Sequence, residues 1–145
     1  MNPITVLLAD DHTIVREGLL ALLQLESDIQ VIGQAKNGRQ AVALAATLCP
    51  DVVVMDIAMP LLNGLEATRQ ILHAAPKTRV LILSAHSDGA YVEKVMALGA
   101  AGYLIKQTAS HMLVAAIREI SAGGPFFSPG VFPGIIESSV QVTIL

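Results

Sequence analysis

The chain of 145 residues has few aromatic side chains, few charges and a single cysteine. Aromatic residues make up only 3% of it and tryptophan is absent, so aliphatic side chains and alanine have to fill the interior. Scarce rings and a net charge of −3 argue against stacking on nucleic acid and against general polyanion binding. Because Cys49 is the only cysteine, the chain cannot form an internal disulfide, which is typical of a reducing compartment.

Long apolar runs are also missing. No stretch of about 18 apolar residues predicts a membrane span, and the N-terminus lacks the pattern of a secretory signal. We therefore expect a cytoplasmic domain without membrane contact. What the sequence does have is 53% hydrophobic residues against 14% charged ones, which excludes a disordered chain and fits one compact domain.

Five short apolar runs alternate with five segments of helical periodicity. The expected strands are Thr5–Ala9, Ile29–Ala35, Asp51–Met55, Arg79–Ser84 and Ala101–Ile105; the expected helices are Thr13–Gln24, Gly38–Leu48, Gly64–Ala75, Ala90–Leu98 and Ala109–Ala122. Runs such as VVVM and VLIL are apolar without alternation, which is typical of strands buried on both faces of a parallel sheet. With right-handed crossovers, this pattern predicts an α/β fold, a doubly wound five-stranded parallel sheet with helices on both faces.

The pattern changes after Gly124. Pro125, Pro129 and Pro133 exclude a long regular helix. Within Val140–Ile144, the apolar residues Val140, Val142 and Ile144 alternate with polar residues, which is a weak strand signal. We divide the chain into a domain over residues 1–124 and a linker or tail over residues 125–145. An extra edge strand or a contact between chains is the alternative for the second segment.

Polar residues follow the predicted strands at the edge where parallel sheets bind their ligands. Asp10 and Asp11 follow the first strand, Asp56 follows the third, Ser84 ends the fourth and Lys106 follows the fifth. We therefore expect three carboxylates, a hydroxyl and an ammonium to meet at one rim.

Such a set suits phosphoryl transfer. Clustered carboxylates require a cation, and oxygen ligands favour Mg²⁺, while an ammonium and a hydroxyl can hold phosphoryl oxygens. Asp56, central in the sheet, is the best candidate for a phosphoryl acceptor. Taken singly, each residue also has an ordinary interpretation, such as a helix cap, a strand-end hydroxyl or a surface charge. The prediction therefore depends on their joint placement.

The segments VLLADDH, DVVVMDIAMPLLNGLEATRQI, VLILSAHSD and ALGAAGYLIK, in this order, resemble a bacterial response-regulator receiver domain over about residues 2–124. DDHTIVREGL and GAAGYLIKQTA are most similar to the NarL/FixJ-type regulators, whose receivers usually precede a LuxR-like helix-turn-helix. The resemblance implies a flavodoxin-like (βα)5 fold with strand order 2-1-3-4-5.

The resemblance also implies roles for the residues at the rim. Asp56 would accept a phosphoryl group from a phosphohistidine on a sensor histidine kinase, or from a small phosphodonor. Asp11 would bind Mg²⁺ (or Mn²⁺) directly, Asp10 would bind it mainly through water, and Asp56 and the backbone carbonyl of Ala58 would complete the ligands.

Further roles concern the switch and the lifetime of the phosphate. Ser84 and Lys106 would hold the phosphoryl oxygens, and Tyr103 would turn inward as Ser84 moves. Ala58 and His86 occupy positions that tend to set phosphate lifetime, although an exposed histidine without a role is the alternative for His86. Gln107 follows the lysine where many receivers have proline, so we expect an ordinary trans bond there.

The predicted function is a phosphorylation-activated signalling switch, with no enzymatic activity beyond self-catalysed phosphoryl transfer and autodephosphorylation. No helix-turn-helix is found in the sequence, so we expect DNA binding only through an output domain absent from this chain, and a weak homodimer on phosphorylation. One alternative is a stand-alone receiver or dimerisation module. Another is an aspartate-nucleophile phosphatase, but the residues Asp10-Asp11-His12 fit the sequence pattern of those enzymes poorly. A dinucleotide-binding module is less favoured still, because the turn after the first predicted strand lacks the glycines that such a module requires.

Overall fold

The computed structural model describes residues 2–85 and 89–128, with only the backbone of residues 89–91. The strands are β1 (Ile4–Ala9), β2 (Ile29–Ala35), β3 (Val52–Asp56), β4 (Arg79–Ser84), β5 (Gly102–Ile105) and β6 (Phe126–Phe127). The helices are α1 (Thr13–Gln24), α2 (Gly38–Leu48), α3 (Gly64–Ala74), α4 (Gly89–Ala97) and α5 (Ala109–Ser121), with a short 3₁₀ turn η1 (Lys106–Thr108). Each predicted element is present, and its ends differ from the prediction by one residue at most.

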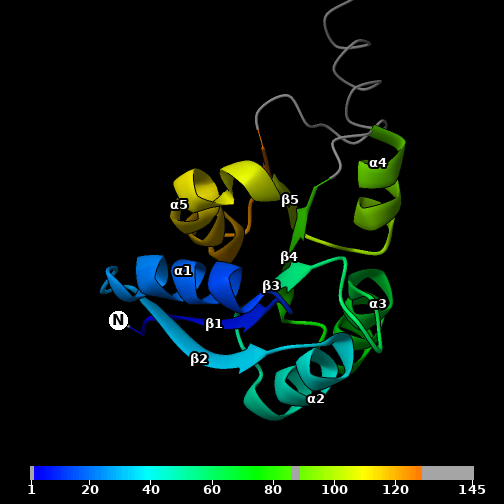
Figure 1. The fold of residues 1–145 in the computed structure, drawn as a ribbon, viewed down its shortest axis with the longest axis horizontal. Helices are drawn as coiled ribbons and strands as arrows, with labels where there is room; N and C mark the ends of the chain where they lie inside the picture. The colour runs from blue at the N-terminus through cyan, green and yellow to red at the C-terminus, as the bar shows by residue number, and fades with distance from the viewer. Residues whose placement is uncertain (1, 86–88, 129–145) are drawn as a thin grey trace, which may run out of the picture.

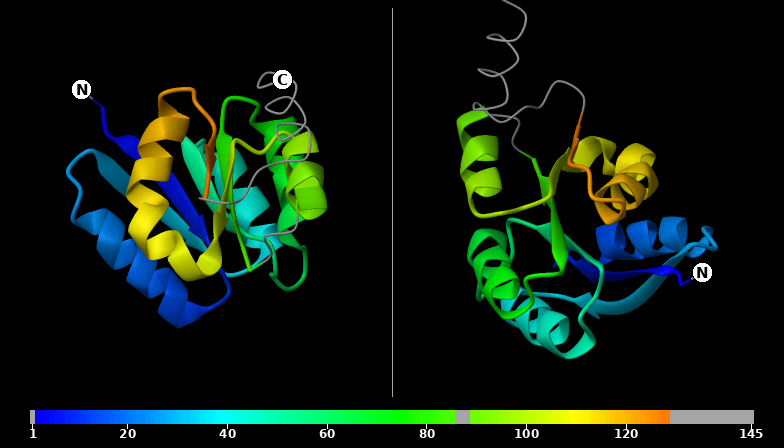
Figure 2. Two further views of the ribbon diagram at one scale, coloured as in Figure 1. Left: turned by 90° about the horizontal axis from the view of Figure 1, so that it is seen from above. Right: turned by 180° about the vertical axis from the view of Figure 1, so that it is seen from behind.

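The strands form one parallel sheet in the order β2-β1-β3-β4-β5-β6. Helices α1 and α5 cover one face, and α2, α3 and α4 cover the other (Figure 1). Figure 2 shows the same three layers from above and from behind. The prediction of a doubly wound α/β fold is therefore confirmed.

The number of strands was predicted wrongly, because β6 adds a sixth strand at the β5 edge. Gly102 pairs with Phe126 and Tyr103 with Phe127, in parallel register. Two residues are too short to give an apolar period, and Pro125 just before them gives no strand signal of its own. The edge strand was the alternative for residues 125–145, and it forms at Phe126–Phe127. Pro129, Pro133 and Val140–Ile144 lie outside the described residues.

Two apolar layers hold the sheet between its helices. Leu8, Val54 and Leu83 are among the residues that pack toward α1 and α5, whereas Leu7, Val53 and Ile82 pack toward α2, α3 and α4. Because the central strands are buried on both faces, they show no polar alternation, and only their carboxyl ends are free to carry polar groups.

The described helices are short. Within residues 2–85 and 89–128 none has the length and apolar character that a bilayer crossing requires.

Candidate functional site

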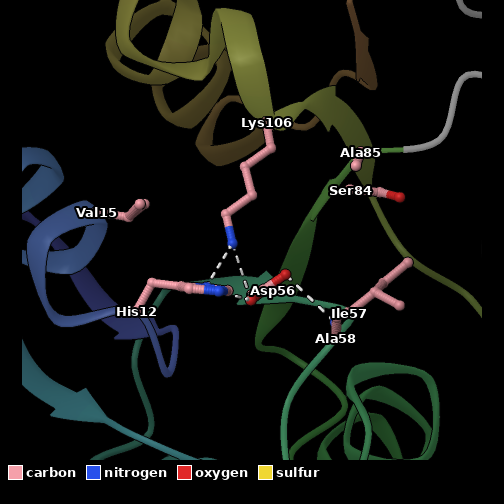
Figure 3. Close-up of a pocket in the computed structure, with 8 residues that line it drawn as sticks. All are labelled: His12, Val15, Asp56, Ile57, Ala58, Ser84, Ala85 and Lys106. Atoms are coloured by element: carbon pink, nitrogen blue, oxygen red, sulfur yellow. Dashed lines mark hydrogen bonds and ion pairs between the residues drawn. The ribbon is translucent and has the colours of Figure 1, made fainter.

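The carboxyl ends of β1, β3 and β5 bring acidic and basic side chains to one rim of the sheet. Asp10 directly follows β1, Asp56 ends β3, and Lys106 directly follows β5. Asp56 and Lys106 line a hollow of about 340 Å³, together with His12, Ser84 and other residues. Figure 3 shows Lys106 reaching from the start of η1 toward Asp56 and His12. The predicted cluster at this edge is therefore present in the structure.

Asp56 is the most enclosed acid of the group together with Asp10, and both residues are only 2% exposed. The Oδ2 atom of Asp56 accepts a hydrogen bond from Lys106 Nζ at 3.0 Å, and its Oδ1 atom accepts one from the backbone amide of Ala58 at 3.3 Å. Burial raises the pKa of the Asp56 carboxyl, and the charge of Asp10 adds to this effect, while the hydrogen bond from Lys106 offsets it in part. The charged form of the Asp56 carboxyl is thus destabilised by burial and by Asp10, and a bound cation would stabilise it.

Lys106 supplies positive charge to both buried acids. Its Nζ atom lies 3.0 Å from Asp56 Oδ2 and 3.3 Å from Asp10 Oδ2. Burial alone would lower the pKa of Lys106, but the hydrogen bond to Asp56 and the charges of both acids outweigh burial and raise it. Lys106 is therefore protonated at neutral pH, and its ammonium can exchange a carboxylate for another anion as its partner.

Two oxygens of the cluster lack hydrogen bonds. Within the described residues, Asp10 Oδ2 and Asp11 Oδ1 are buried atoms that accept none, so that Asp10 Oδ2 has only the ion pair with Lys106. One ligand atom from each of Asp10, Asp11, His12 and Asp56 lies within 4.8 Å of the others. Buried oxygens without donors favour a bound cation. The oxygen-rich donor set fits Mg²⁺, and these residues could hold it.

The remaining predicted residues lie at different distances from this cluster. Ser84 is buried at the end of β4 and lines the hollow, and in the view of Figure 3 its side chain is turned away from the Asp56 carboxylate. Ala58 is exposed and bonds Asp56 through its amide. Tyr103 does not line the hollow; it is fully buried in the layer under α3 and α4. His86 lies outside the described residues.

The bond after Lys106 is trans, since the described residues contain no cis peptide bond. The expectation for the Lys106-Gln107 link is therefore confirmed.

Two residues of the site were missed by the sequence analysis. His12 Nδ1 lies 3.0 Å from Asp10 Oδ1 and 3.0 Å from Lys106 Nζ. Arg16 is 7% exposed, and its guanidinium donates to the backbone carbonyl of Asp10 at 2.7 Å and to Gln34 Oε1 at 3.1 Å. Their signals were the histidine directly after the acidic pair and a lone arginine one helical turn later.

Gly64 shapes the same rim from below. Its amide donates to the carbonyl of Ile57 at 2.8 Å, and a Cβ at this position would lie 2.5 Å from the carbonyl oxygen of Asp56. Asn63 caps α3 by accepting a hydrogen bond from the amide of Glu66. The Asn63-Gly64 pair thus both caps α3 and lets it approach the backbone that carries Asp56.

This fold and rim define an α/β domain with an acidic site at the carboxyl edge of its parallel sheet, and comparison with known proteins narrows the class of protein. The model of the response regulator receiver domain family matches residues 6–118. The chain therefore belongs to the response regulator receiver domain family.

Individual relatives agree with this assignment. The chain is 38% identical over 136 residues to the transcriptional regulatory protein DegU of Brevibacillus brevis, covering 94% of this chain and 58% of the relative. It is 38% identical over 138 residues to the response regulator GacA of Pseudomonas aeruginosa, covering 95% and 64%. The chain thus spans about three fifths of these relatives.

A solved structure gives the same result. A two-component response regulator of the LuxR family from an Aurantimonas species superposes with a TM-score of 0.87 at 36% identity, covering 96% of this chain and 99% of that one. The likeness to NarL/FixJ-type regulators, predicted from the motifs, is confirmed.

Proposed function

We propose that this chain is a phosphorylation-activated switch that accepts a phosphoryl group on Asp56 from a sensor histidine kinase. The observation that carries the proposal is the buried Asp56 carboxylate at the end of a central strand, with an ammonium 3.0 Å away and two further acids beside it. Membership of the receiver family supports this, because receivers act in two-component signalling.

The metal would be held by Asp11 directly, by Asp10 mainly through water, by Asp56, and by the backbone carbonyl of Ala58. The orphaned oxygens of Asp10 and Asp11 support this assignment. When bound, Mg²⁺ (or Mn²⁺) neutralises negative charge on the transferred phosphoryl group.

The chain's own residues would perform the transfer. A carboxylate oxygen of Asp56 attacks phosphorus in line with the phosphohistidine, the P–N bond breaks, and the imidazole leaves with the electron pair. Lys106 exchanges its contact with the acids for one with a phosphoryl oxygen, and the Ser84 hydroxyl donates to another. Hydrolysis of the acyl phosphate resets the switch, with Ala58 and His86 as the positions that set its rate.

The added charge would then act on the packing. A phosphoryl group brings about −1.5 to −2 charge, which pulls Ser84 and Lys106 toward Asp56. Because Tyr103 lies on β5, the strand that Lys106 follows, and is buried in the same apolar cluster as Val92 and Val95 of α4, its ring is the candidate for transmitting the shift to the face formed by α4, β5 and α5.

The output would lie beyond the described chain. DegU is named as a transcriptional regulatory protein, and this chain covers 58% of it. We propose that residues 1–124 are the receiver and 125–145 a linker, which begins with β6 on the edge of the receiver sheet and leads to a helix-turn-helix domain that binds DNA. Phosphorylation would favour a weak symmetric homodimer. Size measurement with and without beryllofluoride tests the pairing, and an unchanged mass contradicts it.

Stoichiometry separates the switch from a phosphatase or a pure dimerisation module. After incubation with acetyl phosphate and Mg²⁺, intact-mass measurement is expected to find one phosphoryl group per chain, none in EDTA and none in Asp56→Asn. Asp51→Asn, an exposed acid at the opposite end of β3, is the matched control and keeps the label. Continuous turnover without stable label favours the phosphatase, and no label at all favours the dimerisation module.

A further inference from the structure

His12 places a ring nitrogen inside the acidic cluster. Its Nδ1 atom lies 3.0 Å from Asp10 Oδ1, 3.3 Å from Asp11 Oδ1 and 3.7 Å from Asp56 Oδ2. The side chain is 56% exposed, and its ring extends toward Asp56 and Lys106 (Figure 3). The imidazole is therefore a fourth potential ligand that comes from the chain segment directly after the acidic pair.

The contacts of Nδ1 conflict with one another when only the protein is considered. Lys106 Nζ, at 3.0 Å, can only donate a hydrogen bond, whereas the carboxylate oxygens of Asp10 and Asp11 can only accept one. A ring nitrogen is one or the other, so each ring form leaves one of these neighbours facing a like partner. Asp11 Oδ1, which lies 3.3 Å from His12 Nδ1, is a buried oxygen that accepts no hydrogen bond within the described residues.

A divalent ion among these atoms removes the conflict. Neighbouring ligands of an octahedral ion with bonds of about 2.1 Å lie about 3 Å apart. The separation of 3.3 Å between His12 Nδ1 and Asp11 Oδ1, the oxygen proposed to bind the metal directly, is close to that spacing. With the ion in place the Nδ1 lone pair becomes a ligand, and the Lys106 ammonium is released toward a phosphoryl oxygen.

An imidazole changes which ion such a site prefers. Mg²⁺ favours oxygen ligands, whereas first-row transition ions accept imidazole nitrogen readily. We propose that His12 ligates the metal through Nδ1 and makes this site selective for a divalent transition ion over Mg²⁺. The proposal rests on the proposed function, since it concerns the same metal site.

Electron paramagnetic resonance of the purified chain with Mn²⁺ as the probe tests this directly. Pulsed measurement of the bound ion is expected to detect coupling to a directly coordinated imidazole nitrogen in the wild type. His12→Ala loses this coupling and weakens Mn²⁺ binding by about tenfold or more, while Mg²⁺ affinity, measured by competition, changes less than about twofold. Alanine is a clean replacement, because the His12 side chain makes no capping hydrogen bond to α1.

His111→Ala, a second exposed histidine on α5, is the matched control and keeps both the coupling and the affinity. Tight Mn²⁺ binding without nitrogen coupling in the wild type overturns the role of His12 and leaves the proposed function standing. Failure of the wild type to bind either Mn²⁺ or Mg²⁺ overturns both.

Discussion

Replacing Asp56 by asparagine is expected to stabilise the fold while abolishing phosphorylation. Asp10 and Asp56 are both 2% exposed, and within the described part of the chain the ammonium that contacts them is that of Lys106. Two buried carboxylates sharing one ammonium leave an excess of negative charge. Asp56→Asn keeps the shape and an oxygen for Lys106 to bond, and it leaves one acid paired with one base.

The size of the effect follows from the burial of the group. Replacing a whole buried ion pair or triad by neutral groups is often neutral or stabilising by about 1–4 kcal/mol, whereas removing one partner of a pair is destabilising when it leaves the other charge alone. In Asp56→Asn the Lys106 ammonium keeps the carboxylate of Asp10, so no charge is left alone. Because the Lys106 side chain is 20% exposed and water reaches the rim, we expect the lower part of that range, about 1–2 kcal/mol. For a chain of this length the gain is a rise of roughly 3–8 °C in Tm.

The assay is urea unfolding in EDTA followed by circular dichroism, since the chain has no tryptophan to report by fluorescence. Glu17→Gln, an exposed acid on α1, is the control and should change the free energy of unfolding by less than about 0.5 kcal/mol. Lys106→Met has the opposite sign, because it strands two buried carboxylates, and is expected to cost about 2–4 kcal/mol. An Asp56→Asn variant no more stable than the wild type refutes the charge argument.

The pH dependence has a definite sign. The pKa of Asp56 in the folded chain is raised above its ordinary value of 3.8, so the folded state holds the proton more tightly than the unfolded one. The contribution of Asp56 to stability is therefore lost as the pH rises from 3.8 through the folded pKa. The wild type minus Asp56→Asn difference in unfolding free energy should become more unfavourable over that window, and a flat difference contradicts the raised pKa.

Three further substitutions test other parts of the rim. Gly64→Ala places a Cβ 2.5 Å from the carbonyl oxygen of Asp56 and should lower the free energy of unfolding in urea by about 1–3 kcal/mol. Gly18→Ala is the control, because the space around Gly18 in α1 is open, and it should raise the free energy of unfolding by about 0.5–1 kcal/mol. Equal effects of the two substitutions would contradict the close approach of Gly64 to Asp56. Arg16→Met removes the buried guanidinium that bonds the backbone carbonyl of Asp10 and so holds the turn with the acidic pair. The rate of labelling by acetyl phosphate should fall about tenfold at subsaturating Mg²⁺ and less at saturating Mg²⁺. An unchanged dependence of the rate on Mg²⁺ would contradict a role of Arg16 in positioning the acidic pair. Ser128→Ala leaves the Ile105 amide of β5 without the hydroxyl that it bonds at 2.8 Å and should cost about 1–2 kcal/mol in urea unfolding. No loss of stability would contradict a contribution of this hydrogen bond to the fold.

Much of the fold could be predicted because its signals are local. The unbroken apolar runs such as Val52–Met55 mark strands buried on both faces, and the rule that ligands bind at the carboxyl edge of parallel sheets places Asp10, Asp56 and Lys106 together before any coordinates. The two-residue strand Phe126–Phe127 escaped, because pairing with β5 and not periodicity creates it.

The chemistry at the rim was less accessible to sequence reasoning. That the His12 ring extends inward depends on its extended backbone before α1 and on the position of Lys106, which is 94 residues away in the chain. The buried Arg16 looks like an ordinary surface charge of an amphipathic helix until the carbonyl of Asp10 is seen opposite it. Contacts of this kind are set by tertiary packing, which no local pattern encodes.

Identifying the residue that carries the phosphoryl group tests most directly whether Asp56 is the phosphoryl acceptor. Borohydride reduces an aspartyl phosphate to homoserine, and tandem mass spectrometry locates the change. After reaction with acetyl phosphate and Mg²⁺, we expect homoserine in place of Asp56 and nowhere else, and none when EDTA replaces the metal. Homoserine in place of Asp10 or Asp11, or labelling of Asp56 that ignores the metal, would contradict this expectation.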